Sequence, residues 1–118
     1  MGEVIEINQL RTFTLDEAKA LLPVVRRVTR LASDQVNQLS TRFSYLTDLA
    51  RKEALEEEVR SVLEEWQVKI EKLGCSAKGV WLVDFNNGEG YYCWHYPETE
   101  LDFFHGYDEG FRGRTKIL

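Results

Sequence analysis

Residues 79–111 read GVWLVDFNNGEGYYCWHYPETELDFFHGYDEGF, and this stretch decides the fold. It holds ten of the fourteen aromatic residues, both histidines and seven acids, but no lysine or arginine. Aromatic and β-branched residues of this density favour strands. The pattern predicts three short strands at 80–85, 91–96 and 101–105. The preceding chain must then supply the layer on which this sheet packs.

The turns between these strands predict their pairing. Asn87-Gly88 is the strongest short hairpin signal in the chain, because both central residues of a type I′ turn need a positive φ. Residues 97–100 form a four-residue loop before the third strand. The sequence therefore predicts a three-stranded antiparallel meander over 80–105.

This meander has one apolar face and one mixed face, because side chains alternate along a strand. A two-residue turn sets Val83 opposite Tyr92, and the four-residue loop sets Trp94 opposite Phe103. We expect the first face to pack on helices and the second to offer an open site. The apolar face holds Trp81, Val83, Phe85, Tyr92, Trp94, Tyr96, Leu101, Phe103 and His105, and the mixed face holds Leu82, Asp84, Tyr91, Cys93, His95, Asp102 and Phe104.

The chain before the sheet is helical. Thr14 and Glu17 form a capping box that starts a helix at Leu15, and Pro23 is expected to kink it. Apolar residues recur at steps of three and four up to Leu73, which is helical spacing. One helix over 15–73 would be about 88 Å long at ~1.5 Å per residue, too long for a small sheet to cover. We therefore expect an antiparallel hairpin with its turn within 47–53.

The length and the net charge of the chain limit the functions that it can have. A chain of 118 residues makes a single domain, 1–118. It has neither a signal peptide nor a run long enough to cross a membrane, so we expect a cytoplasmic protein with Cys75 and Cys93 as free thiols. The net charge of −5 argues against nucleic-acid binding. We expect residues 1–12 to be a leader that could include a brief edge strand at 4–7. Residues 106–118 are expected to be a tail folded back on the sheet through Phe111, with a flexible tail as the alternative.

Several segments together resemble an uncharacterised bacterial family catalogued as domain of unknown function 2203. The resemblance covers the chain from Arg11 onward. It rests on Phe13-Thr14-Leu15-Asp16-Glu17-Ala18, Leu21-Leu22-Pro23, Leu73-Gly74, Leu82-Val83-Asp84-Phe85, Tyr92-Cys93-Trp94, Glu98, Phe104-His105, Gly110-Phe111 and Arg114.

The chain departs from the family pattern at three positions. It has Pro97 where glycine is usual, Phe104 where tryptophan is common, and Asn86 where proline is common. These changes bear on the loop at Glu98 more than on the fold. The resemblance implies no particular activity. It does imply that a set of residues belongs to the family pattern, and these are the candidate ligand-binding residues: Asp84, Cys93, Trp94, Glu98, His105 and Arg114.

A metal site is one interpretation of these residues. Cysteine, histidine and carboxylate are good ligands for transition metals. However, the chain has no His-x-x-x-His or Cys-x-x-Cys spacing, and the predicted register puts His95 and His105 on opposite faces. The alternative is structural. His105 would then bond to the backbone or to Glu98, and Cys93 would be a small buried hydrophobe. We expect no cofactor, and the metal content stays open.

Catalysis is a second interpretation. Asp84 and Glu98 could act as acid and base, or Cys93 could act with a histidine. The chain has no nucleophile elbow, phosphate loop or dinucleotide fingerprint. We therefore favour a structural role in which Asp84 pairs with Arg112 or Arg114 and ties the tail to the sheet.

Two surface features concern partners. Arg26, Arg27 and Arg30 could contact RNA or an acidic partner, although such a run is more often a solvated face paired with nearby acids. The hairpin also has more apolar residues than one sheet can bury, namely Phe43, Tyr45, Leu46, Leu49 and Trp66. We therefore expect a homodimer through the helices, forming a four-helix bundle.

Together these features predict an α+β protein: a kinked helical hairpin at 15–73, a meander at 80–105 and a folded tail. Its predicted function is a non-catalytic homodimeric interaction or ligand-binding module. A metal-dependent enzyme using the acids and histidines of the meander is the alternative.

Overall fold

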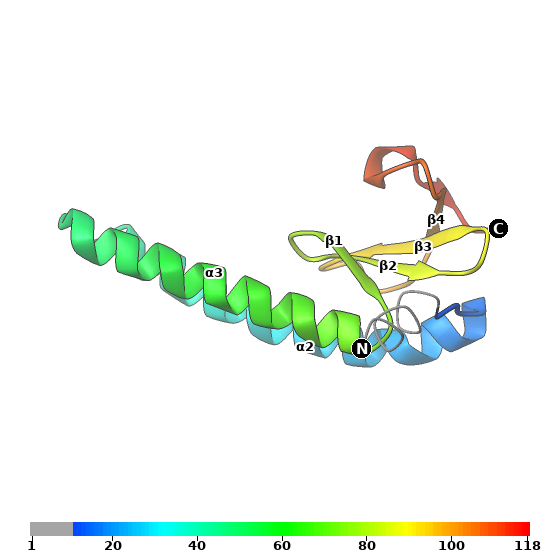
Figure 1. Cartoon of the computed structure of the whole chain (residues 1–118), viewed down its shortest axis with the longest axis horizontal. Coiled ribbons are helices and arrows are strands. Elements are labelled where there is room, and N and C mark those ends of the chain that lie inside the picture. Colours follow the sequence, from blue (N-terminus) through cyan, green and yellow to red (C-terminus); the bar gives the residue numbers. More distant parts are fainter. Residues whose placement is uncertain (1–10) are drawn as a thin grey trace, which may run out of the picture.

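A computed structural model describes residues 11–118 of the chain (Figure 1). The predicted edge strand at 4–7 lies outside these residues, as does most of the predicted leader. Two long helices come first, α2 (Leu15–Phe43) and α3 (Leu49–Lys72). The strands follow: β1 (Ser76–Gly79), β2 (Leu82–Asn86), β3 (Gly90–His95), β4 (Phe103–Gly106), the short 3₁₀ helix η1 (Phe111–Gly113) and β5 (Thr115–Lys116). The predicted α+β class, with two helices before an antiparallel sheet, is confirmed.

The helix ends follow from their caps. The Glu17 N–H donates to Thr14 Oγ1 at 3.1 Å and the Thr14 N–H donates to Glu17 Oε1 at 2.8 Å, which is the predicted capping box. From there α2 continues through Pro23 to Phe43. The turn between the helices occupies 44–48, earlier than most of the predicted interval. Asp48 ends it as the N-cap of α3, because its side chain accepts from the Ala50 N–H at 3.1 Å.

The sheet has five antiparallel strands in the order β1-β2-β3-β4-β5, not the three that we predicted. Each of the two missed strands lies at an edge. The first, β1, reads SAKG and lacks the alternating apolar residues that indicate a strand. The other, β5, has only two residues and pairs Thr115 with Phe104. The meander therefore continues on both sides of its predicted span.

The first predicted strand begins too early at Val80. Residues Val80 and Trp81 instead form the turn that joins β1 to β2, and Trp81 has a φ of +62°. The Trp81 carbonyl accepts from the Tyr96 N–H at 3.0 Å, so this turn is still tied to the end of β3. The Trp81 ring meets the Trp66 ring edge-on, with the two centroids 5.0 Å apart. Trp81 thus connects the sheet to α3.

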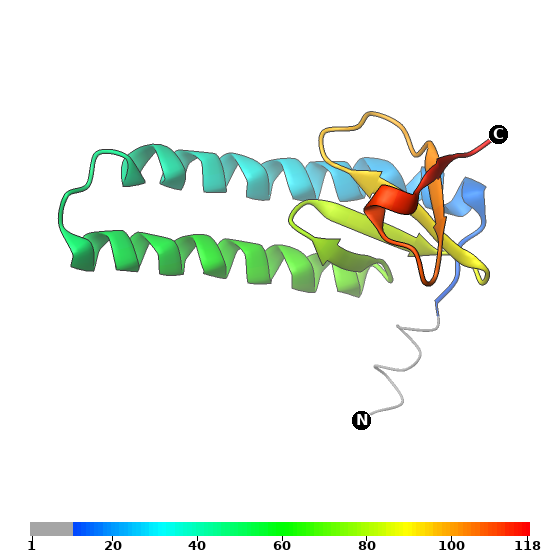
Figure 2. The same ribbon diagram turned by 90° about the horizontal axis from the view of Figure 1, so that it is seen from above.

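The sheet packs on one end of the hairpin, while the other end extends beyond it (Figures 1 and 2). Within the contact, the buried indole of Trp66 donates to Thr29 Oγ1 at 2.9 Å and so joins α3 to α2. Neither helix has the length and apolar character needed to cross a membrane. The hydrophobic core comprises Phe13, Ala18, Leu22, Val25, Ala32, Trp66, Ile70, Cys75, Val83, Phe85, Trp94 and Leu101.

Candidate functional site

The register between β2 and β3 differs from the prediction by two residues. Val83 pairs with Trp94, and Asp84 pairs with Cys93. The connecting turn lies one residue further along the chain than predicted, because the Asn87 N–H bonds to the Gly90 carbonyl at 2.9 Å and leaves Gly88 and Glu89 as its central residues. The Asn87 side chain accepts from the N–H groups of Glu89 and Gly90, each at 2.8 Å. A shift of two residues keeps every side chain on its predicted face.

The register between β3 and β4 differs by one residue, and this changes the site. Tyr91 pairs with His105, and Cys93 pairs with Phe103. A slip of one residue moves a whole strand's side chains to the opposite face. The placement of His105 on the apolar face was therefore wrong. It shares a face with Asp84, Cys93 and His95, so the prediction that the two histidines lie on opposite faces was also wrong.

Three buried side chains converge on this face. Asp84 of β2, Cys93 of β3 and His105 of β4 each offer a ligand atom, and these atoms lie within 4.8 Å of one another. The three side chains are almost inaccessible, with exposed fractions of 2%, 0% and 4%. We call this group the Asp-Cys-His cluster. It joins three adjacent strands at one point.

The imidazole of His105 has a fixed orientation. Its Nδ1 lies 2.9 Å from the carbonyl oxygen of Gly106, and its Nε2 lies 2.9 Å from Asp84 Oδ2. A carbonyl oxygen can only accept, so Nδ1 carries a proton and donates it. In the neutral ring Nε2 then has the lone pair, and it accepts from Asp84 Oδ2 when the Asp84 carboxyl carries a proton. Histidines that bind metals are commonly held in this way, with the distal nitrogen donating to a backbone carbonyl.

Burial shapes the charge states of the other two members. It raises the pKa of Asp84, and this outweighs the neighbouring His105 and Cys93, which lower it. Asp84 Oδ1 is buried and has no hydrogen-bond partner among the described residues. Burial, and secondly the charge of Asp84, raise the pKa of Cys93 to about 12. An unpaired buried carboxylate oxygen is costly unless a partner binds it.

Aromatic residues and the tail cover the cluster. The ring of Tyr91 packs against His105 at 5.4 Å between centroids and meets Tyr107 edge-on at 5.2 Å. The Tyr107 hydroxyl donates to Asn86 Oδ1 at 2.7 Å, which ties the residues after β4 to β2. Phe111 lies against His95 but remains 40% exposed. The tail therefore folds back on the sheet, and Tyr107 holds it alongside Phe111.

Glu98 and Arg114 form a second group beside the cluster. Arg114 donates from Nη1 to Oε1 at 3.0 Å and from Nη2 to Oε2 at 2.6 Å. Its guanidinium lies between the rings of Phe103 and Phe111, at 3.9 and 4.1 Å from their centroids. Partial burial raises the pKa of Glu98, but hydrogen bonds from Arg114 and the His95 N–H and the charge of Arg114 lower it overall.

The Glu98–Arg114 pair replaces an ion pair that the sequence predicted, and its loop contacts Trp94, the last candidate residue. The predicted ion pair from Asp84 to Arg112 or Arg114 is wrong, because Arg114 binds Glu98 and Asp84 binds His105. The sixth candidate, Trp94, lies in the hydrophobic core on the opposite face. Its indole donates to the Glu98 carbonyl at 2.8 Å and so holds the loop that carries the pair.

The six candidate residues thus separate into three positions. Asp84, Cys93 and His105 meet in the cluster, Glu98 and Arg114 pair beside it, and Trp94 supports their loop. The sequence allowed a bond from His105 to the backbone, but it did not identify the Gly106 carbonyl as the acceptor. A backbone carbonyl leaves no signal in residue type, and the local conformation at residues 105–106 directs it to Nδ1.

Comparison with known proteins bears on the same region. No curated protein and no solved structure showed significant similarity to the chain. A family model described as "Uncharacterized conserved protein (DUF2203)" matches residues 11–117, which include both helices, the whole sheet and all six candidate residues. The chain therefore belongs to the DUF2203 family.

Proposed function

We propose that this chain is a metal-binding protein whose Asp-Cys-His cluster holds one divalent transition-metal ion. The observation that carries this proposal is the convergence of three buried ligand atoms within 4.8 Å. Two further features support it. Asp84 Oδ1 lacks a partner among the described residues, and the Gly106 carbonyl fixes His105 with Nε2 toward the other two side chains.

Zinc fits this donor set best. Thiolate, imidazole and carboxylate are the three protein ligand types that zinc takes. Zinc–ligand bonds of ~2.0–2.3 Å place neighbouring ligand atoms of a tetrahedral site roughly 3.3–3.8 Å apart. His105 Nε2 and Asp84 Oδ2 are 2.9 Å apart, so binding would separate them slightly and replace their hydrogen bond. A fourth coordination position remains for water or another ligand.

The burial of the cluster favours a structural or sensing ion over a catalytic one. Its members are between 0% and 4% exposed, and the aromatic cover of Tyr91 and Tyr107 lies over this face. An ion there would cross-link β2, β3 and β4. This supports a non-catalytic binding module, with the metal-dependent enzyme as the alternative. The free thiols Cys75 and Cys93 support the cytoplasm as its proposed location.

Native mass spectrometry on protein purified without chelator tests the metal proposal. We expect one zinc ion per chain, confirmed by elemental analysis, that is lost after treatment with a strong chelator and regained when zinc is added. Magnesium added at the same concentration serves as the control, because it prefers oxygen ligands. A chain that neither retains zinc nor takes it up at equimolar concentration would contradict the proposal.

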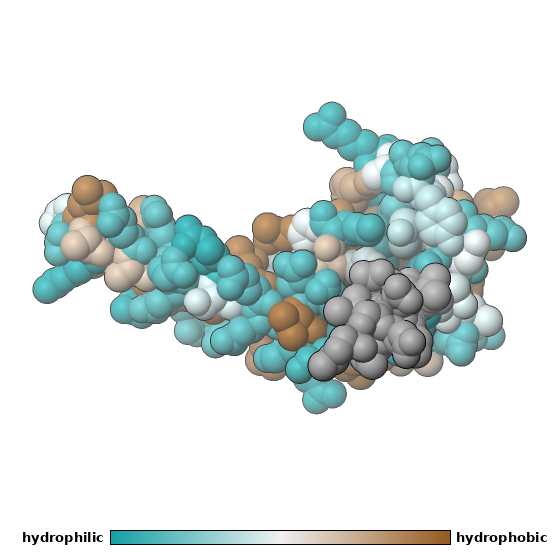
Figure 3. All heavy atoms as spheres, viewed as in Figure 1, coloured by the Kyte–Doolittle hydropathy of each residue, from teal (hydrophilic) through white to brown (hydrophobic). Residues whose placement is uncertain are grey.

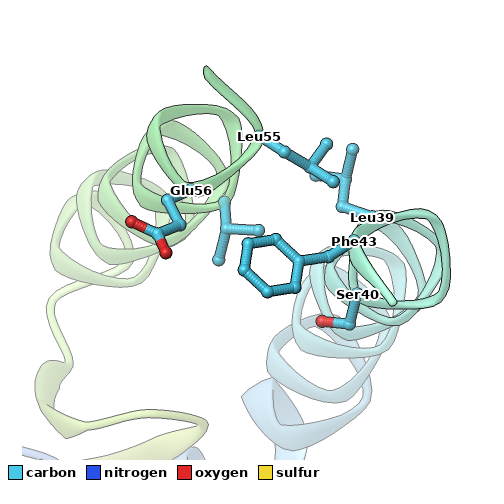
Figure 4. Close-up of a pocket in the computed structure, with 6 residues that line it drawn as sticks. Leu39, Ser40, Phe43, Leu55 and Glu56 are labelled. Atoms are coloured by element: carbon cyan, nitrogen blue, oxygen red, sulfur yellow. The ribbon is translucent and has the colours of Figure 1, made fainter. Parts of the chain in front are cut away.

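A second function, self-association through the helices, is supported by the free end of the hairpin. The hydrophobic core includes no residue of α2 after Ala32. Nearer the free end, a groove of about 290 Å³ lies between the helices, and the Phe43 side chain reaches across this groove toward α3 (Figure 4). Apolar side chains also reach the surface near this end (Figure 3). The groove is lined by Leu39, Ser40, Phe43, Leu55, Glu56 and Val59.

A second copy of this chain is the partner that we propose for this groove. Residues 15–73 have eleven acids and ten bases, so the two charges are balanced over the hairpin. A two-fold axis brings one surface against itself, and a surface with both signs can then pair opposite charges. The resulting dimer would be a four-helix bundle.

Light scattering coupled to size-exclusion chromatography tests this dimer. We expect twice the chain mass of 13.8 kDa for the wild-type protein. Phe43→Glu should give a monomer with the helical circular dichroism retained, because a charge would be buried at the groove. Val80→Glu, at an exposed apolar residue in the β1–β2 turn, should remain dimeric. A monomeric wild-type protein at micromolar concentration would refute this arrangement.

A further inference from the structure

A basic hollow lies between α2 and the residues that follow β3, and none of the Asp-Cys-His cluster lines it. It has a volume of about 290 Å³. Three of its lining residues are arginines of α2, and Arg30 follows Arg27 by three positions and Arg26 by four, so it is a helical neighbour of both. The facing wall comes from the loop after β3. The lining consists of Pro23, Arg26, Arg27, Arg30, Tyr96 and Pro97.

These arginines have no acidic partner within the described chain. The salt bridges of residues 11–118 involve Asp48, Glu57, Asp84 and Glu98, and none reaches Arg26, Arg27 or Arg30. The sequence favoured a helix face paired with nearby acids, and no such ion pair forms among the described residues. Three arginines that form no ion pair with the rest of residues 11–118 create a local positive potential around one hollow, in a chain whose net charge is −5.

The wall opposite the arginines is held firmly. The Tyr96 N–H donates to the Trp81 carbonyl at 3.0 Å, and the Glu98 N–H donates to the His95 carbonyl at 2.8 Å. The Tyr96 ring packs edge-on against Trp94, with centroids 6.2 Å apart. The hollow therefore has a preformed wall, and only the arginine side chains need to adjust. Preorganisation of this kind lowers the cost of binding.

We propose that this hollow binds the phosphate groups of a small phosphorylated molecule. The planar guanidinium of arginine donates paired hydrogen bonds that match phosphate oxygens. Three such groups suit two or more adjacent phosphates better than a single carboxylate. A volume of about 290 Å³ admits a diphosphate and part of the molecule attached to it. The Tyr96 ring offers an amphipathic surface for that part. This inference does not depend on the metal proposal.

Isothermal titration calorimetry of the full chain with sodium pyrophosphate, and separately with ATP, tests the inference. We expect saturable binding with one site per chain and a loss of affinity of roughly tenfold or more in the Arg26→Gln/Arg30→Gln double variant. The control is Arg42→Gln, on the last turn of α2 and away from the hollow. Circular dichroism confirms that each variant is folded.

Three results would overturn the inference. Pyrophosphate and ATP could both fail to saturate at millimolar concentration. Arg42→Gln could weaken binding as much as the double variant, which would indicate a response to total charge. Finally, a single-stranded RNA of about twelve nucleotides could bind far more tightly than pyrophosphate or ATP and displace both of them. That outcome would assign the arginines to an RNA backbone rather than to a small molecule.

Discussion

Replacing Cys93 with serine is expected to abolish stoichiometric zinc binding. A hydroxyl is a far poorer zinc ligand than a thiolate, and the remaining carboxylate and imidazole offer only two protein ligands. Loss of a group that merely orients a metal ligand already costs about 10- to 100-fold in affinity. We therefore expect Cys93→Ser to weaken zinc binding by more than roughly 100-fold.

The same variant should lose the stabilisation that zinc provides. A ligand at about a thousand times its Kd stabilises the native state by about 4 kcal/mol. In a domain of this size that raises Tm by roughly 10–20 °C. Differential scanning fluorimetry with and without zinc measures this shift, and Cys93→Ser should show almost none. Because burial raises the pKa of Cys93 to about 12, wild-type binding must release protons and should strengthen as pH rises.

The chain contains matched controls for the cysteine and for the histidine of the cluster. Cys75 is also buried and free, and burial likewise raises its pKa to about 12, yet it belongs to the hydrophobic core. Cys75→Ser should therefore keep its zinc response even if it lowers stability. His95→Gln should retain binding where His105→Gln loses it, because His95 is not a member of the cluster. Equal zinc responses from Cys75→Ser and Cys93→Ser would show that the cluster is not the site.

The helices could be predicted closely because their signals are local. Thr14, Glu17 and the spacing of apolar residues act within one or two turns, and they give both the start of α2 and the end of α3. The turn between the helices was harder to place, because it contains no glycine or proline. Asp48 marks the start of α3, but an aspartate within a polar helical pattern is a weak cap signal. The sequence alone does not show that its side chain accepts from the Ala50 N–H.

The candidate site was predictable in its residues but not in its geometry. Asp84, Cys93 and His105 were three of the six candidates that the family resemblance implied, and the structure brings these three together. Their meeting depends on the register of β4, which the connection from β3 sets. That connection extends over 96–102 and delays the strand to Phe103, whereas the sequence suggested a four-residue loop. Loop length alone does not encode the bends that fix a register, and one residue of error was enough to move His105 to the wrong face.

Gly90 is the residue in β3 that permits this register. It pairs with Gly106, next to His105. A Cβ atom at position 90 would lie 2.5 Å from the His105 carbonyl oxygen and 2.8 Å from Cζ of Phe104. The first of these atoms belongs to the backbone, which cannot rotate away as a side chain can. Any side chain at Gly90 must therefore push β4 away from β3 at the histidine of the cluster.

Gly90→Ala is accordingly expected to destabilise the fold and impair the site together. Overpacking of this kind costs about 1–3 kcal/mol, which lowers Tm by roughly 5–15 °C. Zinc affinity should fall as well, because displacing the His105 backbone moves its imidazole relative to Asp84 and Cys93. The matched control is Gly110→Ala, where an added Cβ meets no atom within 4 Å and the φ of −105° suits alanine. It should change stability by no more than about 0.5 kcal/mol. Chemical denaturation and zinc titration of both variants provide the measurement. If Gly90→Ala lowered stability but bound zinc like the wild-type protein, the close contact between β3 and β4 at Gly90 would not be what positions His105 for the metal.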